Sequence, residues 1–375
     1  MGRSAYIIIL FIFLSPAVLF AQFSEYSNEF LNIGAGTKGL AMGNAQVASV
    51  NDETAGYWNP AGLTGLKDIS FSLMGANYFS GIGQYEYAAL GIPIDDNKRA
   101  LGISFLRFSV DDIPNTLFLV QPDGSINYND VQSFSSADNA VLLSFAQKIK
   151  ESESMNISVG FNAKIIYREV GSFANAWGFG IDAGLQAYGE RWHAGIVAKD
   201  LTTTFNAWTF HFTDAQKQVL YLTDNAIPIK STELTAPSIV IGGAYDIKIN
   251  RSMSVSAEAS FNVTFDGKRN TVISGNTISL DPHIGIEANI NNVFFVRGGI
   301  TNFQQALADG DTLNQKRVWI YQPSLGAGFK IGKVAVDYAF TNLANQSNPL
   351  YTNVLSLEFI IRNKKDGENK APGTY

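Results

Sequence analysis

The feature that most constrains this chain is an alternation of apolar with small or polar residues, which recurs from residue 68 to residue 361. In residues 254–263, Val, Ala and Phe occupy one parity, and Ser, Glu and Asn occupy the other. Residues 156–167 and 333–341 repeat this pattern. Successive side chains of a β-strand point to opposite faces, whereas a helix would scatter each set around its circumference. The alternation therefore predicts strands with one apolar face.

Fourteen segments carry this alternation, and many of them are unusually long. They are 68–76, 84–94, 99–109, 138–149, 155–167, 176–188, 191–199, 236–246, 252–263, 280–290, 292–300, 319–331, 333–341 and 351–361. Strands of globular proteins usually have about 5–6 residues, whereas about 9–11 residues cross a bilayer at a tilt. The predicted fold is all-β, a transmembrane antiparallel β-barrel of about 14 strands.

The connections between these segments support the same fold. Short connections, such as 95–98 and 189–190, alternate with longer ones, up to the long connection 200–235. Short turns at one end and long loops at the other are typical of bacterial outer-membrane barrels, which also have even strand numbers. A soluble sandwich or propeller is the alternative, but its packed core would not leave one face mostly polar or glycine. Aromatic residues near segment ends fit an interfacial girdle; they are Tyr85, Tyr87, Trp177, Trp192, Trp319, Tyr321 and Tyr351.

Composition agrees with a barrel and excludes other classes. Only 16% of the residues are charged, 12% are aromatic, and cysteine is absent. A disordered chain would be richer in charge and poorer in aromatic residues, and disulfides or thiolate metal sites need cysteine. Acidic residues outnumber basic ones, 33 to 27, so we expect no nucleic-acid partner. The mean hydropathy of +0.03 fits a wall with one lipid-facing and one polar face.

The N-terminal residues predict export. Residues 1–21 combine Arg3, an apolar run to Leu14 and a small residue at position 21, the pattern of a cleaved signal peptide. A retained membrane anchor is the alternative, but the apolar run is short for a span. We therefore expect the outer membrane of a Gram-negative cell, with its lipid as one partner. The polar residues 363–375 predict a disordered periplasmic tail.

The inward parity of the strands predicts what the barrel contains. Ionisable residues assigned to the lumen are Glu86, Arg107, Lys164, Asp182, Glu258, Glu287, Arg297, Lys330, Asp337 and Glu358. They either pair across the lumen or line a substrate path. Inward glycines leave space for a filling segment; they are Gly178, Gly180, Gly184, Gly242, Gly285, Gly299, Gly326 and Gly328. A barrel of this width is not filled by its own side chains, so we expect residues 22–67 to plug a barrel formed by residues 68–362.

Catalytic and cofactor motifs are weak. The glycines at positions 34, 36 and 39 match the dinucleotide-binding spacing, but no strand precedes them. His193, His211 and His283 lack the spacing of a metal site. A Ser/His/Asp site in the outer loops is the enzymatic alternative. We expect no enzyme, no metal and no cofactor.

One stretch of the N-terminal segment resembles a known family. The sequences EFLNIGAGTKGLAMGNA (29–45), NDETA (51–55) and YWNPAGL (57–63) look like the PorV/PorQ family, and the last is also similar to FadL-type fatty-acid transporters. The plug motif comprises Gly34, Gly36, Gly39, Gly43, Asn59, Pro60, Ala61 and Gly62.

The PorV-like resemblance implies a barrel of the type IX secretion system that receives secreted proteins through their C-terminal sorting domains. In that case the loops 110–137, 200–235 and 301–318 would form the docking surface. The FadL-like resemblance implies passive diffusion of small hydrophobic molecules through the plug region. The motif is shared, so both functions are carried forward as hypotheses.

Overall fold

The structure is a computed structural model that describes residues 27–121, 123–228, 230–308, 316–342 and 351–361. The predicted signal peptide (1–21) and C-terminal tail (363–375) lie outside the described residues. No helix within the described ranges is long and apolar enough to cross a membrane.

The described residues form short helices followed by a large antiparallel sheet. The N-terminal helices are η1 (Glu29–Asn32), α2 (Thr37–Ala41), α3 (Ala55–Trp58) and η2 (Pro60–Gly65). The first half of the sheet contains β1 (Ile69–Tyr78), β2 (Gly83–Ile94), β3 (Arg99–Asn115), β4 (Gln132–Lys150), β5 (Asn156–Val170), β6 (Ala174–Tyr188), β7 (Trp192–Lys199) and β8 (Thr204–Phe210). The second half contains β9 (Lys230–Thr235), β10 (Ser238–Lys248), β11 (Met253–Thr264), β12 (Ile273–Ser274), β13 (Ser279–Ile290), β14 (Phe294–Leu307), β15 (Arg317–Ile331), β16 (Val334–Thr341) and β17 (Thr352–Ile361). The loops contain η3 (Phe79–Gly81), η4 (Tyr128–Asp130) and α4 (Asp214–Leu222).

The sheet closes on itself, because β1 pairs with both β2 and β17. β7 and β8 both pair with β6, while β10 pairs with β7 and β9 pairs with β8. β7 and β8 together therefore form one interrupted wall strand, and β9 and β10 form another. β12 is a two-residue addition beside β13. The wall has 14 strands, so the predicted fold class is confirmed. The β1–β17 pairing joins the two ends of the sheet, so the backbone groups there are paired, as a lipid environment requires. Within the described residues β9 pairs with β8 alone.

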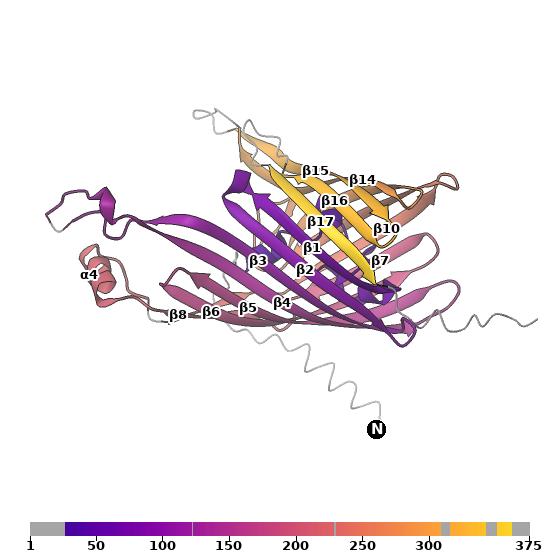
Figure 1. The fold of residues 1–375 in the computed structure, drawn as a ribbon, viewed down its shortest axis with the longest axis horizontal. Coiled ribbons are helices and arrows are strands. Elements are labelled where there is room, and N and C mark those ends of the chain that lie inside the picture. Colours follow the sequence, from indigo (N-terminus) through magenta and orange to yellow (C-terminus); the bar gives the residue numbers. More distant parts are fainter. Residues whose placement is uncertain (1–26, 122, 229, 309–315, 343–350, 362–375) are drawn as a thin grey trace, which may run out of the picture.

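The predicted segments coincide with the wall strands, but some limits differ. β3, β4 and β14 continue well past the predicted ends, and Figure 1 shows β3 to β6 and β8 projecting beyond the rest of the barrel. The connection predicted over 200–235 contains β8, α4 and β9. The polar residues of these extensions hide the alternation, because a strand above the bilayer has no need of a lipid-facing apolar face.

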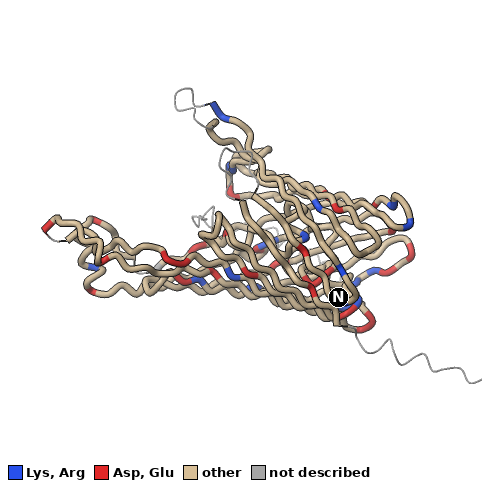
Figure 2. The backbone as a smooth tube through the Cα atoms, turned by 45° about the horizontal axis from the view of Figure 1, so that its top comes forward, with Lys and Arg blue, Asp and Glu red and all other residues tan. Residues whose placement is uncertain are grey.

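The outer face is apolar along the strands. Leu101, Ile103 and Phe105 of β3 point outward and are 40–45% exposed, whereas Ser104 and Leu106, of the opposite parity, are buried. In Figure 2 charged residues recur at the turns and loops, with long uncharged stretches along the strands. Five of the seven predicted girdle aromatics are exposed on the surface.

Tyr85 and Tyr87 do not belong to the girdle, because they are 0% and 2% exposed inside the barrel. They pack with Tyr57 of the N-terminal segment, whose ring lies 6.4 Å from that of Tyr87. The inner face of this part of the wall is apolar because it contacts an apolar part of that segment. Alternation alone cannot tell the two apolar faces apart.

Residues 27–67, called the plug segment below, lie inside the barrel. Their apolar residues form a buried cluster with β1 to β4 that includes Trp58, Leu63 and Leu106. On the other side the plug backbone approaches glycines of the wall. A Cβ at Gly195 would meet the Val47 carbonyl, and one at Gly285 would meet Met42. These inward glycines are required for close approach rather than for turns.

Candidate functional site

Two cavities lie on opposite sides of the plug segment. The long-loop chamber, with a volume of about 720 Å³, adjoins the end of the barrel that carries the long loops. The short-turn chamber, with a volume of about 340 Å³, adjoins the other end. Helix α2 separates them, because Thr37 and Lys38 line the short-turn chamber and Leu40 lines the long-loop chamber. No residue in the described part of the chain lines both cavities.

The long-loop chamber has a polar side and an apolar side. Its lining includes eight carboxamides: Asn32, Asn44, Asn262, Asn270, Asn302, Gln304, Gln322 and Asn342. Hydroxyl groups come from Tyr57, Tyr78, Thr264, Thr271, Ser279, Thr301, Ser324 and Thr341. The purely apolar side chains are Ile33, Leu40, Val47, Phe79 and Val240, and Trp58 adds an indole ring. Most of the polar groups come from β11 and β13 to β16 and the loops beside them, whereas most of the apolar and aromatic groups come from the plug segment and the end of β1.

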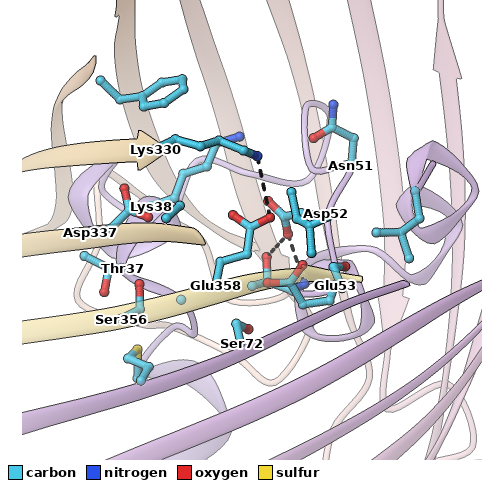
Figure 3. Close-up of a pocket in the computed structure, with 18 of the residues that line it drawn as sticks. Thr37, Lys38, Asn51, Asp52, Glu53, Ser72, Lys330, Asp337, Ser356 and Glu358 are labelled. Carbon is cyan, nitrogen blue, oxygen red and sulfur yellow. Dashed lines mark hydrogen bonds and ion pairs between the residues drawn. The ribbon is translucent and has the colours of Figure 1, made fainter. Parts of the chain in front are cut away.

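The short-turn chamber is strongly charged. Its ionisable residues are Lys38, Asp52, Glu53, Lys67, Asp68, Glu287, Arg297, Lys330, Asp337 and Glu358. In Figure 3 Lys330 reaches toward Glu358 across the wall, with 3.8 Å between Nζ and Oε1, while Asp52 and Glu53 of the plug segment lie beside them. This chamber suits water and polar groups rather than a hydrocarbon.

Glu53 is the unusual group of the short-turn chamber. Its side chain is 3% exposed, and its Oε2 atom has no hydrogen-bond partner within the described residues. Burial raises the pKa of Glu53 to about 8, and the nearby charges of Asp52 and Glu358 act in the same direction. Glu53 is therefore largely protonated at neutral pH.

Inward polar side chains of the wall hold the plug backbone. Glu258 accepts hydrogen bonds from the backbone N–H groups of Ala48 (2.8 Å) and Ser49 (3.1 Å). Gln186 donates from Nε2 to the carbonyls of Ala48 (2.8 Å) and Val50 (2.9 Å). These bonds satisfy polar groups that the barrel would otherwise bury without partners.

Further bonds hold the second half of the plug segment. Asn162 donates from Nδ2 to the carbonyl of Gly56 (2.7 Å), and the hydroxyls of Thr64 and Ser158 lie 2.7 Å apart. Sequence reasoning missed Gln186, Asn162 and Ser158 because they are uncharged. Their signal was parity, since they share the inward face with Lys164 and Asp182.

The plug motif has defined structural roles. Asn59 donates from Nδ2 to the carbonyls of Val47 (2.9 Å) and Leu185 (3.1 Å), and its Oδ1 accepts from the N–H of Ala61 (3.2 Å). It thus caps η2, which starts at Pro60, and ties it to β6. A Cβ at Gly62 would lie 2.4–3.2 Å from Val50 and Ala55, where it has no room.

The glycines near α2 allow close packing around this helix, which separates the two chambers. Gly34, Gly36 and Gly43 have φ of 110°, 76° and 60°, values that side chains rarely allow. A Cβ at Gly39 would lie 2.5 Å from the Trp58 ring, and one at Gly43 would lie 2.6 Å from the backbone of β14. The glycine spacing therefore serves helix packing, and no strand of the described residues precedes it as a dinucleotide site would need.

Eight of the ten ionisable residues assigned to the lumen lie there. Lys164 is 5% exposed; its Nζ lies 2.8 Å from Asp182 and also contacts Asp200, at the interruption between β7 and β8. Arg297 of β14 contacts Glu287 of the neighbouring β13 (2.5 Å) and Asp337 of β16, beyond β15. These groups pair across the wall, so they are committed to structure, and a solute would have to break the pairs to use them.

The assignment of Glu86 and Arg107 to the lumen is wrong, because both lie on the outer face. Their side chains are 52% and 39% exposed, and 3.6 Å separates Oε2 from Nε. On β2 the residues of opposite parity, Tyr85 and Tyr87, are the inward ones. The apolar contact with the plug reverses the expected faces here, and the pair sits near the end of the strands that carries the long loops.

The three histidines lie apart. The Nε2 atom of His193 lies 3.0 Å from Asp246, His211 contacts Asn175, and Nδ1 of His283 lies 2.6 Å from the Thr301 hydroxyl. No group of three or more His, Asp or Glu residues in the described ranges is placed to hold a metal ion.

The fold and its two chambers define a closed, plugged barrel of fourteen strands. Solved structures with this fold include the Ralstonia pickettii toluene transporter TbuX, with a TM-score of 0.54 at 13% identity over 88% of this chain and 99% of that one. The Pseudomonas putida toluene transporter TodX has a TM-score of 0.53 at 12% identity over 87% and 98%. The monoaromatic hydrocarbon channel CymD has a TM-score of 0.52 at 13% identity over 88% and 98%.

At these identities the likeness concerns the fold alone. It shows a barrel fold shared with these proteins and does not bear on the PorV/PorQ family specifically. No family model and no curated protein matches the chain. The neighbours are transporters and channels rather than enzymes.

Proposed function

We propose that this chain is an outer-membrane channel that admits small molecules with an apolar body by passive diffusion. The observation that carries the proposal is the pair of chambers separated by α2 inside a closed wall. A solute enters the long-loop chamber, rests on the plug, and passes when the plug segment shifts. The fold shared with TbuX and TodX, which are toluene transporters, and the resemblance of the plug motif to FadL-type proteins support this function.

The geometry gives the passage a direction of increasing polarity. The long-loop chamber offers Trp58, Phe79 and Val240 to an apolar body, whereas the short-turn chamber is charged. Apolar surface gains about 25 cal/mol per Å² on leaving water. A solute is therefore held in the long-loop chamber. Its release depends on a shift of α2, which separates the chambers, rather than on a second apolar site.

The test is uptake by cells that lack their own hydrophobic-solute channel. We expect the chain to raise the initial uptake rate of a labelled long-chain alcohol, and Val240→Trp to reduce it because the indole fills the chamber. Ile241→Trp is the matched control, since Ile241 is the next residue of β10 and faces outward, 44% exposed. Equal uptake with and without the chain contradicts the proposal.

Docking of secreted proteins is a second proposed function. Exposed apolar side chains crowd two of the long loops, where Val120, Ile126 and Tyr128 are 59–75% exposed and Tyr221 and Leu222 are 70–77% exposed. Such exposure at loop tips favours a protein partner, and the resemblance to PorV-like barrels would make the partner a protein with a C-terminal sorting domain. Deletion of the gene would then leave such proteins unanchored; normal export and anchoring would contradict this function.

A further inference from the structure

We infer that the solute of the long-loop chamber is a neutral amphipathic molecule, with an apolar body and a hydroxyl or amide group that hydrogen-bonds to the β11–β16 wall. This inference rests on the proposed channel function and names its substrate class. Small-molecule pockets are usually lined mainly by apolar side chains with few polar groups. Here eight carboxamides and eight hydroxyls line one cavity.

Several of these polar groups have no internal partner to satisfy them. Asn262 Oδ1 and Thr341 Oγ1 are buried and make no hydrogen bond within the described residues, and Thr341 is 4% exposed. Both residues lie on inward positions of the wall, on β11 and β16. A carboxamide offers donors and acceptors without charge, and a hydroxyl group offers both as well. A ligand with its own hydroxyl or amide would satisfy such groups, which a hydrocarbon would leave buried and unpaired.

The opposite side of the chamber accepts the apolar body. Trp58 and Leu40 of the plug segment and Phe79 beyond β1 all face the cavity. Trp58 is fixed there, because its Nε1 donates to the carbonyl of Ala35 at 2.8 Å. The two sides lie across one cavity, so a single molecule with one polar end can contact both.

The charged residues of the lining give little preference for an anionic or a cationic ligand. Lys199 and Arg269 supply two positive groups to the lining, and Glu29 and Asp281 supply two negative groups, a formal sum of zero. Arg269 is engaged by Asp266, whose carboxylate lies 2.5 Å from its guanidinium. Lys199 lies over the Tyr57 ring at 5.1 Å. The lining therefore favours neutral hydrogen-bonding groups over an anionic head.

The test uses Trp58 as the reporter, because bromine quenches indole fluorescence on contact. Purified full-length protein in detergent is titrated with 11-bromo-1-undecanol, 1-bromoundecane and 11-bromoundecanoate, each corrected for partition into micelles. Trp58→Phe gives the background from the other four tryptophans. The variant Asn262→Leu with Thr341→Val replaces both unpartnered groups by apolar groups of similar shape, and thermal unfolding verifies that it folds.

We expect the alcohol to quench Trp58 at least tenfold more tightly than the bromoalkane, and the double variant to lose about tenfold for the alcohol alone. Equal affinity of the alkane and the alcohol, or an unchanged alcohol affinity in the double variant, overturns the inference but leaves the channel function standing. Carboxylate binding tenfold tighter than alcohol binding also overturns it, and assigns recognition to Lys199. If none of the three quenches Trp58, the channel function falls as well.

Discussion

Asn59 offers the sharpest test of how the plug segment is held. Its side chain is fully buried and makes three hydrogen bonds, to Val47, Leu185 and Ala61. Asn59→Ala leaves two carbonyls and one N–H without these partners. At the low end of about 1 kcal/mol for each unsatisfied buried group, the cost is about 3 kcal/mol. The change acts on the plug and its contact with β6, so we expect the plug to open roughly 100-fold more often, since about 1.4 kcal/mol is a factor of ten.

The assay is hydrogen exchange of the plug amides, followed by mass spectrometry in detergent. Residues 59–66 should exchange roughly 100-fold faster in Asn59→Ala, while the wall strands keep their rates. Asn51→Ala is the matched control, because Asn51 lies in the same segment and is exposed. Unchanged exchange in Asn59→Ala, or an equal effect of Asn51→Ala, would refute the assigned anchoring role.

Three further perturbations test other parts of the structure. Gly195→Ala places a methyl group against the plug carbonyl of Val47 and should raise ion conductance in planar bilayers, whereas Gly75→Ala, with open space around it, should not. Lys164→Met leaves two buried carboxylates unpaired and should destabilise the barrel by about 3–5 kcal/mol in urea unfolding; the same stability as the wild type would show that the cluster is not structural. The pKa of Glu53 is raised from 4.5 to about 8 in the folded protein. Its cost is therefore absent below pH 4.5 and grows to its full value above pH 8, so Glu53→Gln should raise the unfolding temperature at pH 8 and leave it unchanged at pH 4.

The sequence predicted the wall well because alternation is a local property. The segments 252–263 and 280–290 match β11 and β13 within one residue. The positions of most ionisable residues in the lumen could be predicted from strand parity. Glu258, for example, shares its parity with Ser and Asn residues, whereas the opposite parity is apolar.

The failures share a physical cause. Glu86 and Tyr87 were assigned to the wrong faces because the inner wall near the plug is itself apolar, a long-range contact that strand periodicity does not encode. The chambers could not be predicted either, because they depend on how the plug segment folds against distant strands such as β10 and β14. The inward glycines of the wall indicated space for a filling segment, and their contacts with that segment became visible only in three dimensions.

In the proposed channel, a small molecule with an apolar body binds between the long loops and the plug segment. The most direct measurement is a crystal structure with 11-bromo-1-undecanol, in which anomalous scattering locates the bromine. We expect a bromine peak within the long-loop chamber, beside Trp58 and Phe79, with the hydroxyl at the β11–β16 wall. Bromine found only on the lipid-facing surface, with the chamber occupied by water, would contradict it.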